Sequence, residues 1–202
     1  MVGNNFCVYV LKTVKGNRTY VGKTNDMHRR YRQHIKILTN GARYTSCIKA
    51  DNEWIPVAQV IGFHDEKQAL QFEYAMKGKM NAYRNKQLSV QKRNEIKDMY
   101  MTSIQNAHSR PCQRVIQLLQ CICLPKWTSK AIEAEHVNLK IVWYGPHYRP
   151  QNMERLLANI PYVTDLIHDG IGDREVIIYQ TNDHDYTNQQ RLPVPIKQNE
   201  LV

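Results

Sequence analysis

Residues 7–23 read CVYVLKTVKGNRTYVGK, and this stretch decides the fold. The segments Phe6–Lys12 and Arg18–Lys23 are rich in β-branched and aromatic residues, which favours extended strands. A Lys-Gly-Asn sequence between them supplies a turn. The pattern therefore predicts a β-hairpin in which Tyr9 and Tyr20 lie on adjacent strands.

Two helices and one more strand are expected after the hairpin. A capping residue at positions 24–26 predicts the start of a helix that runs to about Leu38. Trp54–Phe63 is predicted as a strand whose early proline suits a strand start or an edge better than a centre. A second helix is predicted at Asp65–Met80. We therefore expect residues 1–83 to form an α/β (α+β) domain with a three-stranded, mainly antiparallel sheet flanked by helices.

The pattern changes after this first domain. Asn81–Arg110 is polar and basic with a weak apolar stripe, which indicates a linker. We expect residues 84–180 to form an accessory α/β region and residues 181–202 a flexible tail. The elements predicted there are a helix at Val115–Leu124, a strand at Val137–Tyr144, a short helix at Met153–Ile160 and a strand at Glu175–Gln180.

The positive charge of the chain is confined to its first half. The formal net charge is +10, and residues 1–100 carry 18 Lys and Arg against 8 Asp and Glu, whereas residues 101–202 carry 10 of each. Such asymmetry predicts contact with a polyanion, because each neutralised phosphate releases condensed counterions. No basic amphipathic helix with apolar anchors is visible, so a nucleic acid is favoured over a membrane.

Composition also predicts the compartment. No apolar run approaches the roughly 18 residues of a membrane span, and the first residues lack the features of a signal peptide. The 5 cysteines have no regular spacing, which favours a reducing compartment over a secreted disulfide scaffold. We expect an intracellular protein that is not secreted.

Polar side chains interrupt the apolar faces of both predicted helices of the first domain. Glu73 falls on the inward stripe of the second helix, where a carboxylate costs free energy unless it is paired or binds a cation. His34 lies within the stripe of the first helix, and Arg30 is its neighbour one turn away. If this face packs on the strands that carry Tyr9 and Tyr20, phenols, a guanidinium, an imidazole and a carboxylate converge. A salt-bridged Glu and a buried structural His remain the simpler alternatives for each residue alone.

This combination of side chains suits phosphodiester hydrolysis. A metal ion polarises the phosphate, a base or proton shuttle activates water, and a rigid cation offsets the developing charge. Arginine fits the last task because its planar fork matches phosphate oxygens. One carboxylate suffices for Mg²⁺, which keeps several of its waters.

The ordered motifs resemble the GIY-YIG nuclease superfamily. Cys7-Val8-Tyr9 and, eleven residues after the first tyrosine, Tyr20-Val21-Gly22 look like its paired signature. The segments that carry a closer similarity, to the catalytic subunits of Slx-type structure-specific endonucleases, are RTYVGKTNDMHRRYRQH, the GARYTS stretch at 41–46 and VIGFHDEKQALQFEYAMK at 60–77. Relatives of that type carry a C-terminal RING, which this sequence does not show, so no RING-mediated partner is expected.

The resemblance implies a role for each matching residue. Glu73 matches the metal ligand, for one Mg²⁺ or Mn²⁺ ion per site, and Tyr9 matches the candidate for activating water. Tyr20 and Lys23 match residues that organise waters and the phosphate. Arg30 matches the arginine that stabilises the transferred charge, and His34 a position used for proton transfer or positioning. We assign four further cations only to DNA backbone contact: Arg29, Arg32, Lys36 and Arg43.

The expected activity is cleavage of branched DNA, such as flaps, forks or four-way junctions, in DNA repair, recombination or junction resolution. The nucleus or a viral DNA replication site is the expected location. A sequence-specific restriction or homing enzyme and a catalytically silent DNA- or protein-binding module are the alternatives. A homodimer or a regulatory partner subunit is compatible with each of them.

A zinc site is a further alternative in the second half. Cys112, Cys121 and Cys123, with His108 and His136 nearby, invite it. The C-x-C spacing is not the usual one for zinc, and its two cysteines point to different sides of one helix. Buried cysteines that behave as small apolar side chains are the favoured interpretation.

Overall fold

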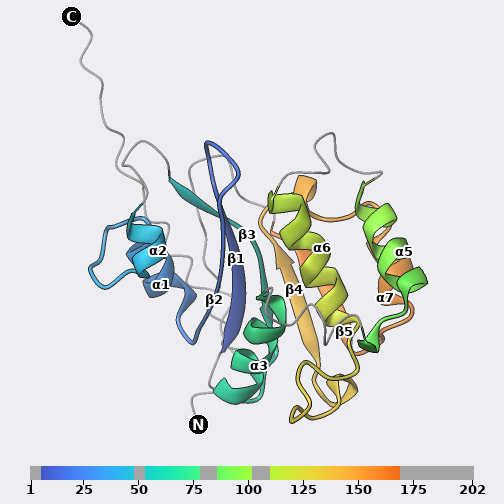
Figure 1. The fold of residues 1–202 in the computed structure, drawn as a ribbon. Helices are drawn as coiled ribbons and strands as arrows, with labels where there is room; N and C mark the ends of the chain where they lie inside the picture. Colours follow the sequence, from blue (N-terminus) through green and yellow to red (C-terminus); the bar gives the residue numbers. More distant parts are fainter. Residues whose placement is uncertain (1–5, 48–52, 78–85, 102–109, 169–202) are drawn as a thin grey trace, which may run out of the picture.

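The structure, a computed structural model, describes residues 6–47, 53–77, 86–101 and 110–168, and it contains one mixed β-sheet (Figure 1). The sheet has five strands in the order β2-β1-β3-β4-β5. These strands are β1 (Cys7–Thr13), β2 (Thr19–Thr24), β3 (Trp54–Ile61), β4 (Leu139–Trp143) and β5 (Val163–Ile167). The helices are α1 (Met27–His34), α2 (Arg43–Ser46), α3 (Glu66–Met76), α5 (Val90–Met101), α6 (Arg110–Ile122) and α7 (Met153–Leu157), with short 3₁₀ turns η2 (Ala134–His136) and η3 (Pro146–Tyr148).

The predicted hairpin is confirmed. β1 and β2 pair antiparallel, with Tyr9 opposite Gly22 and Leu11 opposite Tyr20. Gly16, in the turn between the strands, has a φ of 88°, a conformation that glycine adopts without steric cost. β2 lies at one edge of the sheet, so one side of this strand faces away from the other strands.

The sheet is larger than the three strands expected from the sequence. The predicted strand at Val137–Tyr144 is confirmed as β4, and it pairs antiparallel with β3. β5, at Val163–Ile167, was not predicted and pairs parallel with β4. The accessory region therefore continues the sheet of the first domain. The predicted boundary at residue 83, the strand at Glu175–Gln180 and the tail at 181–202 lie outside the described residues.

Although β3 is an inner strand, its proline lies in a part of the strand that pairs with β1 alone. Pro56 lies opposite Leu11 of β1, next to a register shift between Val10 and Leu11. On its other side β3 pairs with β4 only from Ala58 onward. Pro56 therefore precedes the part of β3 that needs hydrogen bonds on both sides, which suits a residue without an N–H group.

Both helices of the first domain begin where the sequence predicts. Asp26 caps α1 by accepting a hydrogen bond from the Arg29 N–H at 2.8 Å. Asp65 caps α3 in the same way, through the Gln68 N–H at 2.7 Å. The predicted end of the first helix near residue 38 is wrong, because α1 stops at residue 34 and Lys36 adopts a φ of 66°.

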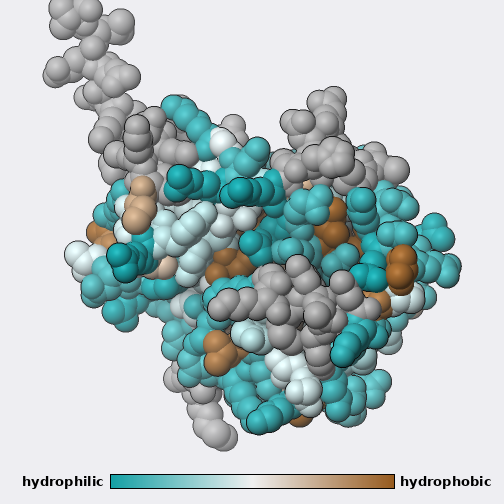
Figure 2. Space-filling model, in the orientation of Figure 1, coloured by the Kyte–Doolittle hydropathy of each residue, from teal (hydrophilic) through white to brown (hydrophobic). Residues whose placement is uncertain are grey.

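The hairpin and β3 present two different faces. Alternate side chains such as Val8, Val10 and Val21 join a large core with α3 and α6, the helices drawn in front of the sheet in Figure 1. Tyr9 and Leu11 point the other way and join a smaller cluster with α1. The surface seen in Figure 2 is mainly hydrophilic, with hydrophobic residues in small separate groups. Among the helices of the described ranges, none has the length and apolar character needed to cross a membrane.

Candidate active site

Tyr9 is the centre of a polar cluster between the sheet and α1. The residue is completely buried in the middle of β1. Its hydroxyl lies 2.7 Å from His34 Nε2, and Arg30 Nε donates to it at 3.2 Å. Because Arg30 and His34 are one helical turn apart on α1, both reach the same phenol.

A threonine determines which nitrogen of His34 carries the proton. The Thr45 hydroxyl donates its only proton to the carbonyl of Ala42 at 2.9 Å, and it lies 2.9 Å from His34 Nδ1. The hydroxyl oxygen must therefore accept the Nδ1–H of His34, which leaves Nε2 as an acceptor. It follows that the Tyr9 hydroxyl donates its proton to His34.

The charge states of Tyr9 and His34 agree with this arrangement. Burial, and then the positive charge of Arg30, lower the pKa of His34 to about 4, so the imidazole is neutral near pH 7. Burial raises the pKa of Tyr9 well above its ordinary value, and Tyr20 adds to this effect while Arg30 opposes it. The structure thus holds a neutral phenol hydrogen-bonded to a neutral imidazole.

Arg30 brings a positive charge into this neutral cluster. Its hydrogen-bond partners are the Tyr9 hydroxyl and Gln33 Oε1, the latter at 2.9 Å, and both are uncharged. Burial alone would lower the pKa of Arg30, but the hydroxyls of Tyr9 and Tyr20 raise it above the usual value. Within the described residues Arg30 forms no ion pair. A partly buried guanidinium of this kind favours an incoming anion, and its planar fork suits a phosphate.

Tyr20 lies on the same face as Tyr9 but is partly exposed. Its ring centroid is 6.1 Å from that of Tyr9 and 4.9 Å from that of His34. Gly22 makes this packing possible, because a Cβ at that position would lie 2.4 Å from the Tyr9 hydroxyl. The pleat therefore brings Tyr9, Tyr20, Arg30 and His34 together, as the hairpin and α1 pattern led us to expect.

Lys23 is placed on the other side of β2. It lies opposite Val8, whose side chain belongs to the α3 face, and it pairs with Glu66 at the start of α3. Lys23 and Arg30 nevertheless line one hollow of about 350 Å³ at the end of β2. This Arg30 hollow is lined by Phe6, Lys23, Thr24, Asn25, Asp26, Arg29, Arg30, Gln33 and Glu66.

Glu73 lies on α3, and the neighbouring Phe72 and Met76 pack into the core on the valine side of the sheet. The Glu73 side chain is only 11% exposed, and its carboxylate forms an ion pair with Lys77 Nζ at 2.8 Å. The contacts of the tyrosine cluster described above come from β1, β2, α1 and α2, whereas Glu73 and Lys23 approach from the α3 side. The described residues show no hydrogen bond or ion pair between Glu73 and the tyrosine cluster, so the convergence of this carboxylate with the phenols stays a prediction.

A single carboxylate limits which metal this part of the chain suits. In the described ranges no three or more His, Cys, Asp or Glu side chains are grouped so as to hold a metal ion. Zinc usually takes several nitrogen or sulfur ligands, whereas Mg²⁺ takes one or two carboxylates and keeps waters. The buried oxygens of Glu73 fit a hard divalent cation of this kind, which would compete with Lys77.

The four cations assigned to DNA contact are spread over α1 and the segment after it. Arg29 and Arg43 are exposed, and Arg32 is partly exposed. Lys36 is exposed in the turn that ends α1. Only Arg29 among the four lines the Arg30 hollow.

Two positioning residues were not predicted. Thr45 is completely buried and orients His34, and Gln33 holds the guanidinium of Arg30. The only signal for Thr45 was its place in the GARYTS stretch, because hydrogen bonding between α1 and α2 leaves no local pattern. Gln33 is adjacent to His34, but its contact depends on the rotamer of Arg30.

Comparison with known proteins is consistent with this geometry. Residues 5–87 match the family described as the GIY-YIG catalytic domain. The protein named "Structure-specific endonuclease subunit SLX1" from Candida dubliniensis is 36% identical over 90 residues, which cover 44% of this chain and 30% of that protein. Proteins of the same name from Eremothecium gossypii and Ajellomyces capsulatus are 38% and 44% identical over 71 residues, or 35% of this chain, and 24% and 17% of their own lengths. The similarity thus covers less than a third of each of these relatives.

Proposed function

We propose that this chain, whose residues 5–87 match the GIY-YIG catalytic domain, is an endonuclease that hydrolyses phosphodiester bonds in branched DNA with the help of a divalent metal ion. The observation that carries the proposal is the position of the Tyr9 hydroxyl between Arg30 and the accepting nitrogen of a neutral His34. This arrangement supplies a proton acceptor and an anion-binding cation at a single point.

Water is activated by a coupled proton transfer. A water molecule gives a proton to the Tyr9 oxygen while Tyr9 passes its own proton to His34 Nε2, so the phenol stays neutral and His34 becomes an imidazolium. The hydroxide oxygen attacks phosphorus as the bond from phosphorus to the leaving oxygen breaks. The leaving alkoxide takes a proton from solvent water, and the imidazolium returns its proton to solvent through Tyr9, which restores the starting state. A neutral buried phenol could not serve as a base by itself, so its proton passes on to His34 Nε2, and the low pKa of this imidazole rises when the phosphate neutralises the charge of Arg30.

Substrate binding and water activation are linked through Arg30. Tyr9 is completely buried, and Arg30 covers its hydroxyl. A phosphate that enters the Arg30 hollow attracts the guanidinium, which then uncovers the Tyr9 oxygen for water. Lys23 also lines the hollow, beside its partner Glu66, and adds positive charge near the phosphate.

Glu73 would hold the divalent cation, Mg²⁺ or Mn²⁺, which when bound supplies charge stabilisation at the phosphate. The remaining residues bind and orient the substrate strand around the edge of β2. The concentration of positive charge in residues 1–100 supports DNA as the polyanion.

The preference for branched DNA is supported by the names of the relatives, which call them structure-specific endonuclease subunits. We extend this preference to the present chain, together with a role in DNA repair or recombination at sites of DNA replication. The same names are the reason to include association with a partner subunit in the proposal.

The test is a cleavage panel with purified protein. Labelled four-way junctions, splayed arms, flaps and linear duplex are incubated with Mg²⁺, with Mn²⁺ and with EDTA. We expect cleavage of the branched substrates with metal only, and a loss of at least about 100-fold in Glu73→Gln. Glu95→Gln, which changes an exposed carboxylate on α5, is the matched control and should retain full activity.

Each other outcome contradicts a defined part of the proposal. Undiminished cleavage in EDTA or by Glu73→Gln overturns the metal mechanism. Cutting at one defined sequence of a linear plasmid favours a restriction or homing enzyme. Tight junction binding with no cut under any metal favours a silent binding module.

A further inference from the structure

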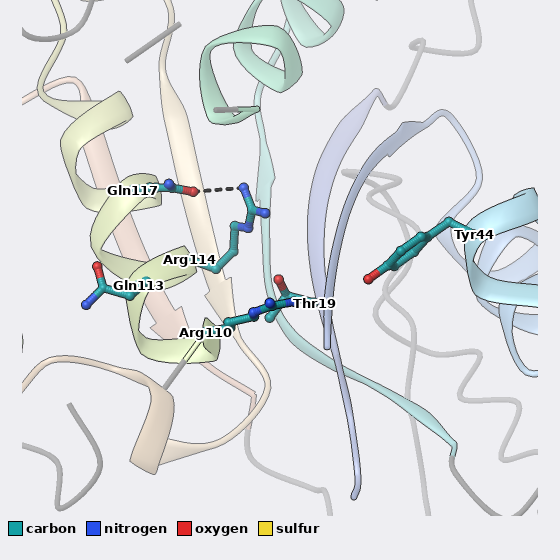
Figure 3. A pocket seen from close by; sticks show the side chains of 6 residues that line it. All are labelled: Thr19, Tyr44, Arg110, Gln113, Arg114 and Gln117. Carbon is teal, nitrogen blue, oxygen red and sulfur yellow. Dashed lines mark hydrogen bonds between the residues drawn. The ribbon is translucent and has the colours of Figure 1, made fainter. Parts of the chain in front are cut away.

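A second hollow lies beside the catalytic cluster, where the first domain meets the accessory region. It has a volume of about 320 Å³ and is shown in Figure 3. We name it the α6 groove; its lining residues are Thr19, Tyr44, Arg110, Gln113, Arg114 and Gln117. They come from β2, α2 and α6, so the groove exists only in the folded assembly of both halves.

Hydrogen-bond donors dominate this groove. Two arginines carry positive charge, and none of the six lining residues is acidic. Arg114 is held in place, because its guanidinium donates to the Met76 carbonyl at 3.0 Å and to Gln117 Oε1 at 2.8 Å. In Figure 3 the Tyr44 hydroxyl points toward Thr19 and the α6 arginines. Hydroxyl, amide and guanidinium donors around a hollow form a site for phosphate oxygens.

The α6 groove is connected to the catalytic cluster by one aromatic contact. The Tyr44 ring, which is 47% exposed, stacks on Tyr20 with a centroid distance of 6.4 Å and an interplanar angle of 19°. Tyr20 in turn lies 4.9 Å from the ring centroid of His34. A strand bound in the groove therefore passes close to the reacting phosphate.

We infer that the α6 groove binds a backbone phosphate of the unpaired strand next to the branch point of the substrate. This inference rests on the proposed function and specifies how the nuclease distinguishes branched DNA from duplex. A concave hollow between two structural units admits a single strand that leaves the duplex, and cations beside an exposed aromatic ring are typical of single-strand sites. The Arg30 hollow, on the other side of the cluster, then takes the strand to be cut.

The test measures DNA binding without cleavage. Fluorescence anisotropy in EDTA compares a splayed-arm DNA with a duplex of the same length, for wild-type protein and Arg110→Ala. Arg110 is exposed, so the variant should fold normally. We expect splayed-arm binding to weaken by about 5- to 10-fold and duplex binding to stay within about twofold. The slope of log affinity against log salt should fall by about 0.7 for the lost single-strand phosphate contact.

The control is Arg155→Ala, which removes an exposed arginine on α7. Equal losses for splayed-arm and duplex DNA, no loss for either, or the same loss in Arg155→Ala would each overturn the inference. The cleavage panel tests the proposed function separately, because the anisotropy comparison measures binding and does not require any cut. If Arg110→Ala binds splayed-arm DNA as tightly as the wild type does, and the wild type cleaves branched DNA with metal, the α6 groove is rejected as a strand-binding site while the proposed function stands.

A second pair of variants examines the tyrosine. Tyr44→Phe removes only the hydroxyl and keeps the ring on Tyr20, and it should weaken splayed-arm binding by about 2- to 3-fold. Tyr74→Phe is the matched control, since Tyr74 on α3 is 46% exposed and does not line the groove. A Tyr44→Phe protein that binds splayed arms as the control does would show that the hydroxyl does not contact the strand.

Discussion

The two faces of β1 and β2 use the same alternating backbone for opposite purposes. On one face, Val8, Val10 and Val21 are buried among apolar side chains of α3 and α6. On the other, Tyr9 is buried just as deeply, but its hydroxyl is held by Arg30 and His34. Burial of the apolar side chains thus stabilises the protein on one face. On the other face, burial keeps Tyr9 and His34 uncharged. The comparison predicts that truncating the apolar side chains of the first face costs stability, whereas removing the polar groups around Tyr9 costs activity.

Tyr9→Phe should produce the largest change in activity. The substitution removes the hydroxyl that transfers the proton, and general acid–base catalysis contributes about 10²–10⁴-fold in rate. We therefore expect the single-turnover cleavage rate to fall by about 100-fold or more. The free energy of unfolding should fall by only about 1–3 kcal/mol, because two buried groups lose a partner.

Tyr31→Phe is the control for this prediction. Tyr31 is buried on the same face, but its hydroxyl donates to the Trp54 carbonyl at 2.8 Å, away from the cluster. A similar loss of stability with nearly full activity is expected. If both variants lost activity equally, the Tyr9 hydroxyl would have no special part in the reaction.

Phe72→Ala tests the apolar face. Phe72 is completely buried, and its ring packs against Phe63 at 5.4 Å and Trp127 at 5.3 Å between centroids. Truncating such a residue costs about 3–5 kcal/mol, from lost burial and the cavity left behind. Urea denaturation should show this loss, whereas Leu70→Ala, at a position 48% exposed on the same helix, should stay within about 0.5 kcal/mol. A small effect of Phe72→Ala would mean that the core relaxes around the cavity.

The fold was predictable where local pattern decides it. Alternating β-branched and aromatic residues, a Gly turn and two Asp caps were sufficient for the hairpin and for the starts of α1 and α3. The partners of β3 were not predictable, because pairing of β3 with β4 joins residues about 80 positions apart and no local signal encodes it. The early end of α1 was also missed, since Lys36 adopts a left-handed conformation without being a glycine.

The candidate site divides in the same way. Arg30 and His34 were expected together because helical spacing places them on one face, and Tyr9 and Tyr20 because the hairpin does. The location of Lys23 on the opposite side of β2 follows from the pleat once the register is known. The hydrogen bond between Thr45 and His34 could not be predicted, because it depends on how α2 packs against α1.

The pH dependence of stability tests the charge state of the buried imidazole. The ordinary pKa of His34 is 6.5 and burial lowers it to about 4. As pH falls, the unfolded chain takes up this proton first, so stability present above about pH 6.5 is lost progressively as pH approaches about 4. The difference between the two pKa values corresponds to at most about 3 kcal/mol.

We expect this loss in the wild type but not in a variant that lacks the imidazole. The free energies of unfolding of wild type and His34→Gln should therefore converge by up to about 3 kcal/mol between about pH 7 and pH 4. His136→Gln, which alters an exposed histidine outside the tyrosine cluster, is the control measured beside it. A pH-independent difference for His34→Gln would show that the imidazole is not held neutral by burial.

The smallest expected effect comes from a residue that touches neither substrate nor Tyr9. Thr45→Val keeps the shape of the side chain but removes the acceptor for His34 Nδ1–H. Without this acceptor, nothing holds the imidazole proton on Nδ1, and the tautomer that carries it on Nε2 becomes populated. This tautomer cannot accept a hydrogen bond from Tyr9. We expect the cleavage rate to fall by about tenfold, less than for Tyr9→Phe because the imidazole is still present.

Rescue and a matched control separate this role from simple destabilisation. Thr45→Ser retains the hydroxyl and should restore most of the rate, although it removes a buried methyl group. Thr13→Val is the control, because Thr13 is buried on β1 and its hydroxyl has no hydrogen-bond partner among the described residues. That variant should be neutral or more stable, since no hydrogen bond is lost and a buried polar atom disappears. If Thr45→Ser were as slow as Thr45→Val, the methyl contact rather than the hydroxyl would position His34, and the direction of proton transfer from Tyr9 would have to be explained by another group.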